Sequence, residues 1–473
     1  MLLSDLAARA PDLTVWYTDA GALPRAALFG WIRDPFAFSI HTVNGTALAQ
    51  AALFLFQGAC AVGLLIGLRT PWMALLSWFL MVSLQDRNPL VFMGGADTLL
   101  RLMLFWSLFL PLGTYASLDA AYDPSRKTTP VRHFSLGTAA ILLQVAMMYL
   151  MTSAYKWRTD IWRQGTALRV VLSNEIFAKP ALRLLLPFPA LMAFLTHSVL
   201  WLELLAPLLL FSPMLTGPVR TVAALGLMAM HLGFVLFLDI DFFQMVSLAG
   251  LTLFLPSWLW DTLMPKFRAP AWVRSARIRP AMTRLGAFLK GFTSDPRHET
   301  VRPAPLRDAC VIVFFGCVLS WNLASILPSR YRMLPALRAL SRAAHLDQQW
   351  GMFARPLPPT GWFVMPGALK DGTEVDLWRG GAPLSWEKPD PWCASWKGMR
   401  WRKYLFRLLP DQRVAREYAR YLCRSWNAAH GGERGLVSLE IDYMTVRPDG
   451  GAGAYGKRIL LRQHCSAGPK RHS

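Results

Sequence analysis

Long apolar runs separated by short polar connections cover most of the first 330 residues. A membrane helix needs roughly 20 consecutive apolar residues, and shorter runs are tolerated inside a bundle. We therefore expect transmembrane helices at about 46–68, 71–84, 90–112, 136–155, 188–212, 219–238, 242–258 and 309–327. Together these runs predict an all-α polytopic membrane bundle of about eight spans within residues 1–330.

The chain changes character after this bundle. From Arg338 it becomes polar and proline-rich. Alternating residues at 374–378 and 436–446, and a short apolar run at 459–461, predict strands, whereas 395–408 and 411–428 have the spacing of amphipathic helices. The dipeptide Asp371-Gly372 is a turn signal. We therefore expect residues 338–473 to form a small extramembrane α+β domain.

Composition and charge support a membrane protein. A hydrophobic content of 54% is too high for a soluble chain of 473 residues. The net charge of +21 comes from cations that lie in loops between apolar runs, so it fits anionic lipid better than nucleic acid, which we exclude as a partner. The spacing of the six cysteines does not indicate a metal site, and no nucleophile triad or phosphate-binding motif is present.

The basic loops predict the orientation. The longest, 265–307, is placed in the cytoplasm by the positive-inside rule, as is the loop with Arg126, Lys127 and Arg132. Lys156, the 239–241 turn and the 338–473 domain then face the outside. In an oxidising compartment, one disulfide can form among Cys393, Cys423 and Cys465.

The stretch from Tyr149 to Gly165 is the most informative part of the bundle. An apolar run carries almost no charge until Lys156, after which charged residues alternate with two tryptophans. Lys156 has two interpretations. It extends its ammonium group to the lipid headgroups, or it lies in a shielded pocket, where loss of its proton makes it a base.

Other polar residues interrupt the predicted spans. Asp97 and Arg101 stand four residues apart, so they predict an ion pair on one helix face, either as a structural lock or as part of a pocket. Glu203, with His197 near it, and His231 occupy the next two spans, where a Glu–His contact would relay a proton. The alternative for His231 is a hydrogen-bonded packing residue.

The Tyr149–Gly165 stretch resembles a segment of vitamin K-dependent gamma-carboxylases and of bacterial proteins with the related horizontally transferred transmembrane (HTTM) domain. In that segment a Tyr precedes a Lys, and Trp-x-x-Gly follows. Similar motifs occur at 17–19, 101–113 and 231–256, so the resemblance covers roughly 15–260. Family members usually have a membrane helix before the 17–19 loop, and we expect this chain to start inside that helix.

The resemblance implies a lipophilic quinone or hydroquinone, similar to vitamin K, as the bound cofactor or substrate. Lys156 then corresponds to the base, with His231 and Glu203 as further candidate catalytic residues, and Asp97, Arg101 and Asn88 as structural or pocket-lining residues.

One position departs from the family pattern. Asn88 is followed by Pro89, where the carboxylases have His, and a proline side chain cannot hydrogen-bond to an oxyanion. This substitution argues against carboxylation itself. Two hypotheses remain: a quinone-dependent membrane enzyme, and a non-catalytic membrane protein that uses the same cavity to bind lipid or a partner or to pass a solute. The C-terminal domain is a separate candidate for binding a protein partner. In either case we expect the plasma (inner) membrane of a bacterium.

Overall fold

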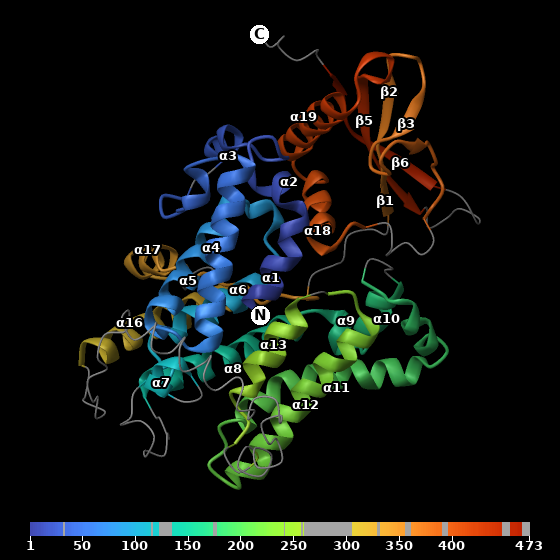
Figure 1. Cartoon of the computed structure of the whole chain (residues 1–473). Coiled ribbons are helices and arrows are strands. Elements are labelled where there is room, and N and C mark those ends of the chain that lie inside the picture. The colour runs from blue at the N-terminus through green and yellow to red at the C-terminus, as the bar shows by residue number, and fades with distance from the viewer. Residues whose placement is uncertain are drawn as a thin grey trace, which may run out of the picture.

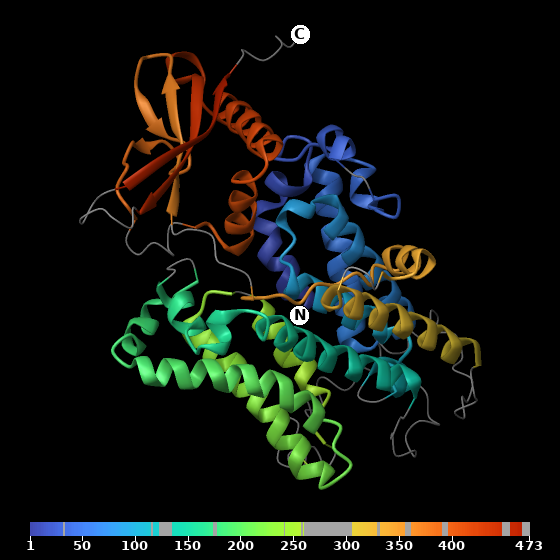
Figure 2. The same ribbon diagram turned by 180° about the vertical axis from the view of Figure 1, so that it is seen from behind.

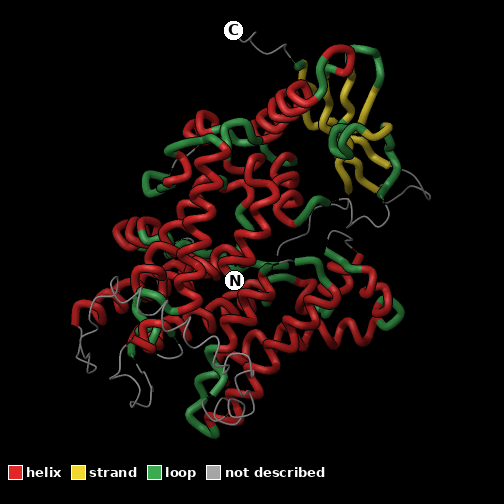
Figure 3. Tube along the Cα trace, viewed as in Figure 1, coloured by secondary structure: helices red, strands yellow, loops and turns green. Residues whose placement is uncertain are grey.

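The computed structural model describes residues 1–31, 34–114, 117–122, 135–173, 177–240, 242–256, 259, 305–328, 332–354, 361–389, 396–446 and 455–465. These residues form a mostly helical protein whose antiparallel sheet lies in the C-terminal region (Figure 3). The loop with Arg126, Lys127 and Arg132, together with Asp241 and Cys393, lies outside the described residues, as does the basic loop up to residue 304.

Five described helices are long and apolar enough to cross a membrane. They are α4 (Ala47–Ile66), α8 (Leu136–Lys156), α11 (Pro189–Leu209), α12 (Thr216–Phe237) and α16 (Pro305–Ile326). The other three predicted spans form the 18-residue α5 (Thr70–Arg87), the 13-residue α6 (Gly95–Ser107) and the 10-residue α13 (Phe243–Thr252). α5 ends in Gln85-Asp86-Arg87, whereas α6 and α13 are too short to span a bilayer alone.

Shorter elements precede, connect and follow these helices. They are α1 (Leu2–Arg9), η1 (Ala10–Asp12), α2 (Leu13–Tyr17), α3 (Arg25–Trp31), η2 (Ile40–Thr42), η3 (Pro89–Val91), α7 (Leu118–Tyr122), α9 (Asp160–Arg163), α10 (Ala167–Ser173), η5 (Pro180–Leu185) and α17 (Pro335–Ala343).

Helix α8 lies at the centre of the bundle. It packs against α11, α16 and α6, and 61% of its apolar window is buried, compared with 22–33% for the other four candidate spans. Its start is fixed by a capping box in which the side chains of Ser135 and Thr138 each accept a backbone N–H. Because α8 is surrounded by protein, its polar residues face other helices instead of lipid.

The C-terminal region contains a six-stranded antiparallel sheet. Its centre is the long strand β5 (Leu436–Val446), which pairs with β6 (Tyr455–His464) on one edge and with β1 (Gly361–Val364) and β2 (Pro366–Leu369) on the other. β2 continues to β3 (Glu374–Asp376) and β4 (Ala382–Pro383). The strands expected at 374–378, 436–446 and 459–461 are confirmed within β3, β5 and β6.

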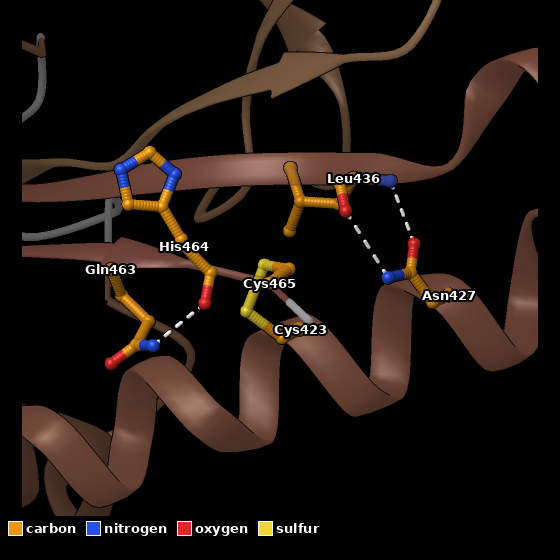
Figure 4. Close-up of a disulfide and its surroundings, with 6 residues drawn as sticks. All are labelled: Cys423, Asn427, Leu436, Gln463, His464 and Cys465. Atoms are coloured by element: carbon orange, nitrogen blue, oxygen red, sulfur yellow. Dashed lines mark hydrogen bonds between the residues drawn. A yellow bond between two sulfur atoms is a disulfide. The ribbon is translucent and has the colours of Figure 1, made fainter. Parts of the chain in front are cut away.

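Two amphipathic helices separate this sheet from the N-terminal helices (Figure 1). They are α18 (Met399–Leu408) and α19 (Gln412–Ala429), and both confirm the predicted helices. A disulfide between Cys423 of α19 and Cys465, just after β6, joins this helix to the sheet (Figure 4). After Asp371 the chain turns at Gly372, whose φ of 83° is easily adopted by glycine.

A strap of residues 344–354 leads from α17 toward the sheet and crosses the middle of the molecule (Figure 2). Leu346 and Trp350 are buried within it, and Gln348 accepts a hydrogen bond from Gln144 of α8 at 2.8 Å. Burial lowers the pKa of His345 to about 4, so its ring is neutral at pH 7. The strap is thus an internal part of the helical bundle.

Four buried charges connect the two ends of the chain to α6. Arg9 lies 2.8 Å from Asp5 and 3.0 Å from Asp97, and Arg400 of α18 lies 2.6 Å from Asp5 and 3.2 Å from Asp97. Burial and the nearby Arg9 oppose the charge of Arg400, but Asp97 and Asp5 raise its pKa above the ordinary value. We call these four residues the buried ion cluster. Two guanidinium groups balance two carboxylates.

The predicted ion pair between Asp97 and Arg101 is wrong. Asp97 belongs to the buried ion cluster, whereas Arg101 lies 3.1 Å from Asp347 of the strap and donates to Gln85. The spacing of four residues allows a pair, but it does not require one. Arg9 and Arg400 contact both oxygens of Asp97 from outside the helix, and Asp347 provides Arg101 with a separate acceptor.

We predict that Arg400→Met destabilises the folded protein. It leaves two buried carboxylates with one guanidinium, and breaking a buried ion pair costs about 3–5 kcal/mol of the free energy of unfolding. Thermal unfolding of the purified protein in detergent measures the change. The matched control is Arg420→Met, which removes an exposed pair with Glu417 and should cost less than about 1 kcal/mol. Equal effects of the two variants would show that the cluster is not a stabilising contact.

Candidate functional site

Lys156 is the last residue of α8, and its side chain turns into the protein. Its Nζ atom lies 2.7 Å from both carboxylate oxygens of Glu203 on α11, and the two residues are only 2% and 3% exposed. The ring of Trp162 lies 4.4 Å from the same nitrogen. Lys156 therefore does not extend to the lipid headgroups. Glu203 pairs with it, and not with His197, which contacts the carbonyl of Arg163.

The chain after Lys156 explains how Trp162 returns over the ammonium group. α8 ends at Lys156, and the short helix α9 follows after a turn. Gly165 then adopts a φ of 71°, and a Cβ atom there would lie 2.6 Å from the His197 ring. The Trp-x-x-Gly motif thus needs glycine for two reasons, a left-handed backbone conformation and the close approach of α11.

A second polar pair lies two turns earlier on the same face of α8. Tyr149 Oη is 2.7 Å from Nε2 of His231 on α12, and Gln244 of α13 contacts Nδ1 of that ring. The His231 ring therefore lies between the Tyr149 hydroxyl and the Gln244 amide and contacts one of them with each ring nitrogen. Tyr149 and His231 are 2% and 1% exposed.

A small cavity of about 20 Å³ lies between the two polar pairs. Tyr149, Lys156, Glu203 and His231 line it, together with apolar side chains such as Phe353 of the strap. This volume is enough for one water molecule, and the polar groups around it offer several hydrogen-bond partners. The geometry therefore allows one water to connect the Lys156–Glu203 pair to the Tyr149–His231 pair.

A larger apolar cavity of about 330 Å³ opens beside Lys156. It lies between α10, α11 and α12, and α11 contributes apolar side chains such as Leu195 and Leu202 to its wall. On α12, the small residues Gly226, Ala229 and Gly233 face it at intervals of three and four, so that one face of the helix leaves room. The size and the apolar walls fit a lipophilic small molecule.

The remaining candidates lie elsewhere. Asp97 and Arg101 connect helices and the strap, as described above, and neither lines these two cavities. Asn88 caps η3 and donates to the carbonyl of Trp16 at 2.9 Å, so its role is structural. No group of three or more His, Cys, Asp or Glu residues in the described part of the chain could hold a metal ion.

The structure also identifies residues that the sequence did not single out as functional. Tyr149 and Gln244 hold His231, and the strap residue Phe353 forms part of both cavity walls. A helical spacing of seven between Tyr149 and Lys156 places both on one face, and this signal was available in the sequence. No sequence signal places Phe353 there, because it lies 191 residues from Trp162, which donates to its carbonyl oxygen.

Helix α11 has one irregularity next to the site. Pro207 lies inside the helix, four residues after Glu203, and is buried. A proline has no N–H group, so the helical hydrogen bond to the carbonyl of residue 203 is not made.

We predict that Lys156 and Glu203 stabilise the fold only as a pair. Lys156→Met leaves Glu203 buried without a partner and should lower the free energy of unfolding by about 3–5 kcal/mol, whereas the double variant Lys156→Met, Glu203→Leu should recover most of this loss. Thermal unfolding in detergent measures both. Arg163→Met is the control, because it removes an exposed partner of Asp160. Additive losses in the double variant would contradict the pairing.

A comparison with known protein families finds a match over the part of the chain that contains this site. The family described as the HTTM domain matches residues 31–258. No curated protein and no solved structure matches the chain. The matched range contains Lys156, Glu203 and His231, and it ends well before α18 and the sheet.

Proposed function

Residues 31–258 form an HTTM domain, which is shared with vitamin K-dependent gamma-carboxylase, and on this basis we propose that the protein is an integral membrane enzyme that binds a lipophilic hydroquinone and removes a proton from it. The observation that carries the proposal is the buried Lys156–Glu203 pair at the wall of an apolar cavity of about 330 Å³.

The apolar cavity supports the choice of substrate class. Its walls come largely from α11 and α12, two of the membrane-spanning helices, so a ligand can enter from the lipid phase. The cavity is apolar apart from a few polar side chains, among them Lys156 and Thr196. A ring with an apolar tail and one hydroxyl directed at Lys156 matches this distribution.

Lys156 and Glu203 supply the proton chemistry. In water an ammonium and a carboxylate are both charged, but removal from water penalises both charges, so the proton can move from Nζ to a Glu203 oxygen. The neutral amine then accepts the proton of the hydroquinone O–H group, which leaves a hydroquinone anion beside the new ammonium. A water molecule in the small cavity of about 20 Å³ would connect Glu203 to His231 and Tyr149 and so extend the path for the proton.

Carboxylation is not part of this proposal. Asn88 and Pro89 lie at η3, where Asn88 bonds to the chain near the N-terminus. Neither residue lines the cavities beside Lys156. The group that acts on an oxyanion in the carboxylases therefore has no counterpart at Pro89.

We predict that Lys156→Ala abolishes hydroquinone turnover. The test supplies menaquinol with a short prenyl tail to the purified protein in air and follows quinone absorbance. Dioxygen takes two electrons and two protons from each hydroquinone to give hydrogen peroxide, and ionisation by Lys156 accelerates this loss. We expect a decrease of at least about 10²-fold.

Two variants complete this test. Lys156→Met, Glu203→Leu should be inactive yet folded, and Lys370→Ala, which removes an exposed lysine far from the site, should be fully active. Wild-type turnover in the Lys156→Ala protein would remove Lys156 from the reaction.

A second function has one observation in its favour. Glu203 already satisfies the Lys156 ammonium with two hydrogen bonds, which is the arrangement of a structural ion pair. In that case the apolar cavity holds a lipid without chemistry. Mass spectrometry of the purified protein distinguishes the two: a lipid that copurifies equally with wild type and the double variant, with no turnover by either, supports this second function.

We also propose that the C-terminal region lies on the outer face of a bacterial plasma membrane. The Cys423–Cys465 disulfide supports this side, because such bonds persist in oxidising compartments and are rare in the cytosol. The positive-inside rule places the basic 265–307 loop in the cytoplasm, on the opposite side of the membrane from the C-terminal region.

We predict that Thr373→Cys is labelled by a membrane-impermeant maleimide on intact cells, in a background where Cys60, Cys310, Cys317 and Cys393 are replaced by serine. The matched control is Ser212→Cys, in the loop between α11 and α12, which should be labelled only after lysis because the spanning helix α12 separates it from Asp239, which contacts Arg402 of the C-terminal region. Labelling in the reverse pattern would invert the orientation.

A further inference from the structure

A second cavity, of about 310 Å³, lies between the helical bundle and α18. The start of α6 forms one wall with Gly94 and Gly95, and the strap forms another with Gln349 and Met352. Met399 and the exposed Lys403 of α18 form a third wall. Glycine leaves this space open, because a Cβ atom at residue 95 would lie 2.7 Å from the Met352 sulfur. We call this space the α18 cavity.

The α18 cavity has apolar walls and few polar side chains. Phe177, Ile240, Phe243 and Met352 contribute apolar surface, and Gln349 contributes an amide. Lys403 is the cationic group in its lining. A site of this kind favours a ligand with an apolar body and one negative group.

Two cations of α18 next to Lys403 are already paired. Arg400 belongs to the buried ion cluster, and Arg402 lies 3.2 Å from Asp239. For Lys403, by contrast, no hydrogen bond or ion pair is found with any described residue. Its three donors are therefore available to a ligand. One available ammonium balances a single negative charge, which fits a carboxylate better than a phosphate dianion.

We propose that the α18 cavity binds a small amphipathic carboxylic acid, with the carboxylate on Lys403 and the apolar part against Met352, Phe243 and Ile240. This site goes beyond the proposed hydroquinone reaction, because Lys403 lies outside the HTTM domain. The two sites are adjacent. Phe353 lines both the α18 cavity and the apolar cavity, so the acid and the lipophilic ligand would share one strap residue as part of their walls.

The test uses 2-naphthoate as the probe and naphthalene-2-carboxamide as its neutral counterpart. Isothermal titration calorimetry is performed on the full-length protein in phosphatidylcholine nanodiscs, without hydroquinone. We expect one naphthoate per chain. Lys403→Ala should weaken naphthoate at least about 10-fold, the size of one charge-assisted hydrogen bond, whereas Lys403→Arg should bind within a few-fold of wild type. The carboxamide should bind weakly and be insensitive to Lys403→Ala.

Two further variants make the result specific. Lys370→Ala removes an exposed charge from the same region and should leave binding unchanged. Met399→Trp fills the cavity and should weaken both probes while Lys403 is retained. Unchanged naphthoate affinity in both Lys403→Ala and Met399→Trp would overturn the proposal. The hydroquinone assay is separate, since Lys156→Met, Glu203→Leu should still bind naphthoate.

Discussion

The structure depends on one constraint, that a charge removed from water must meet an opposite charge. Several buried ionic contacts join parts of the chain that are far apart in sequence. Lys156 meets Glu203 across α8 and α11, and the buried ion cluster joins α1, α6 and α18. These contacts fix how the helices pack, because a small shift would leave a buried charge alone. The N-terminal helix and the C-terminal region are thereby attached to the same point of the bundle.

The strap of residues 344–354 lies between the apolar cavity and the α18 cavity. It enters the bundle with Leu346 and Trp350, is held by the Gln144–Gln348 and Trp162–Phe353 hydrogen bonds, and leaves toward the sheet. Its residues separate an apolar cavity that faces lipid-embedded helices from one that faces α18. The strap, which lies outside the HTTM domain, therefore contributes to the walls of the candidate site inside that domain.

Much of this fold could be predicted from the sequence, because apolar runs and alternating strands are local patterns. The long spans, β5, α18 and α19 follow directly from their spacing. The lengths of α6 and α13 were overestimated, because the apolar runs in the sequence extend beyond the residues that form the helices. β1, β2 and β4 were missed because each is two to four residues long and depends on pairing within the sheet.

For the candidate site too, the sequence predicted individual residues but not their tertiary contacts. Lys156, Glu203 and His231 were found as ionisable groups in apolar helices, and the structure gathers them around one small cavity. Their contacts could not be predicted, because Lys156 lies 47 residues from Glu203 and Tyr149 lies 82 residues from His231, so each contact follows from the tertiary fold. Pro207 adds a mechanical consequence. Because Pro207 leaves the carbonyl of Glu203 without its helical hydrogen bond, α11 has one backbone bond fewer beside the buried carboxylate, so a bend at this turn costs less than elsewhere in the helix.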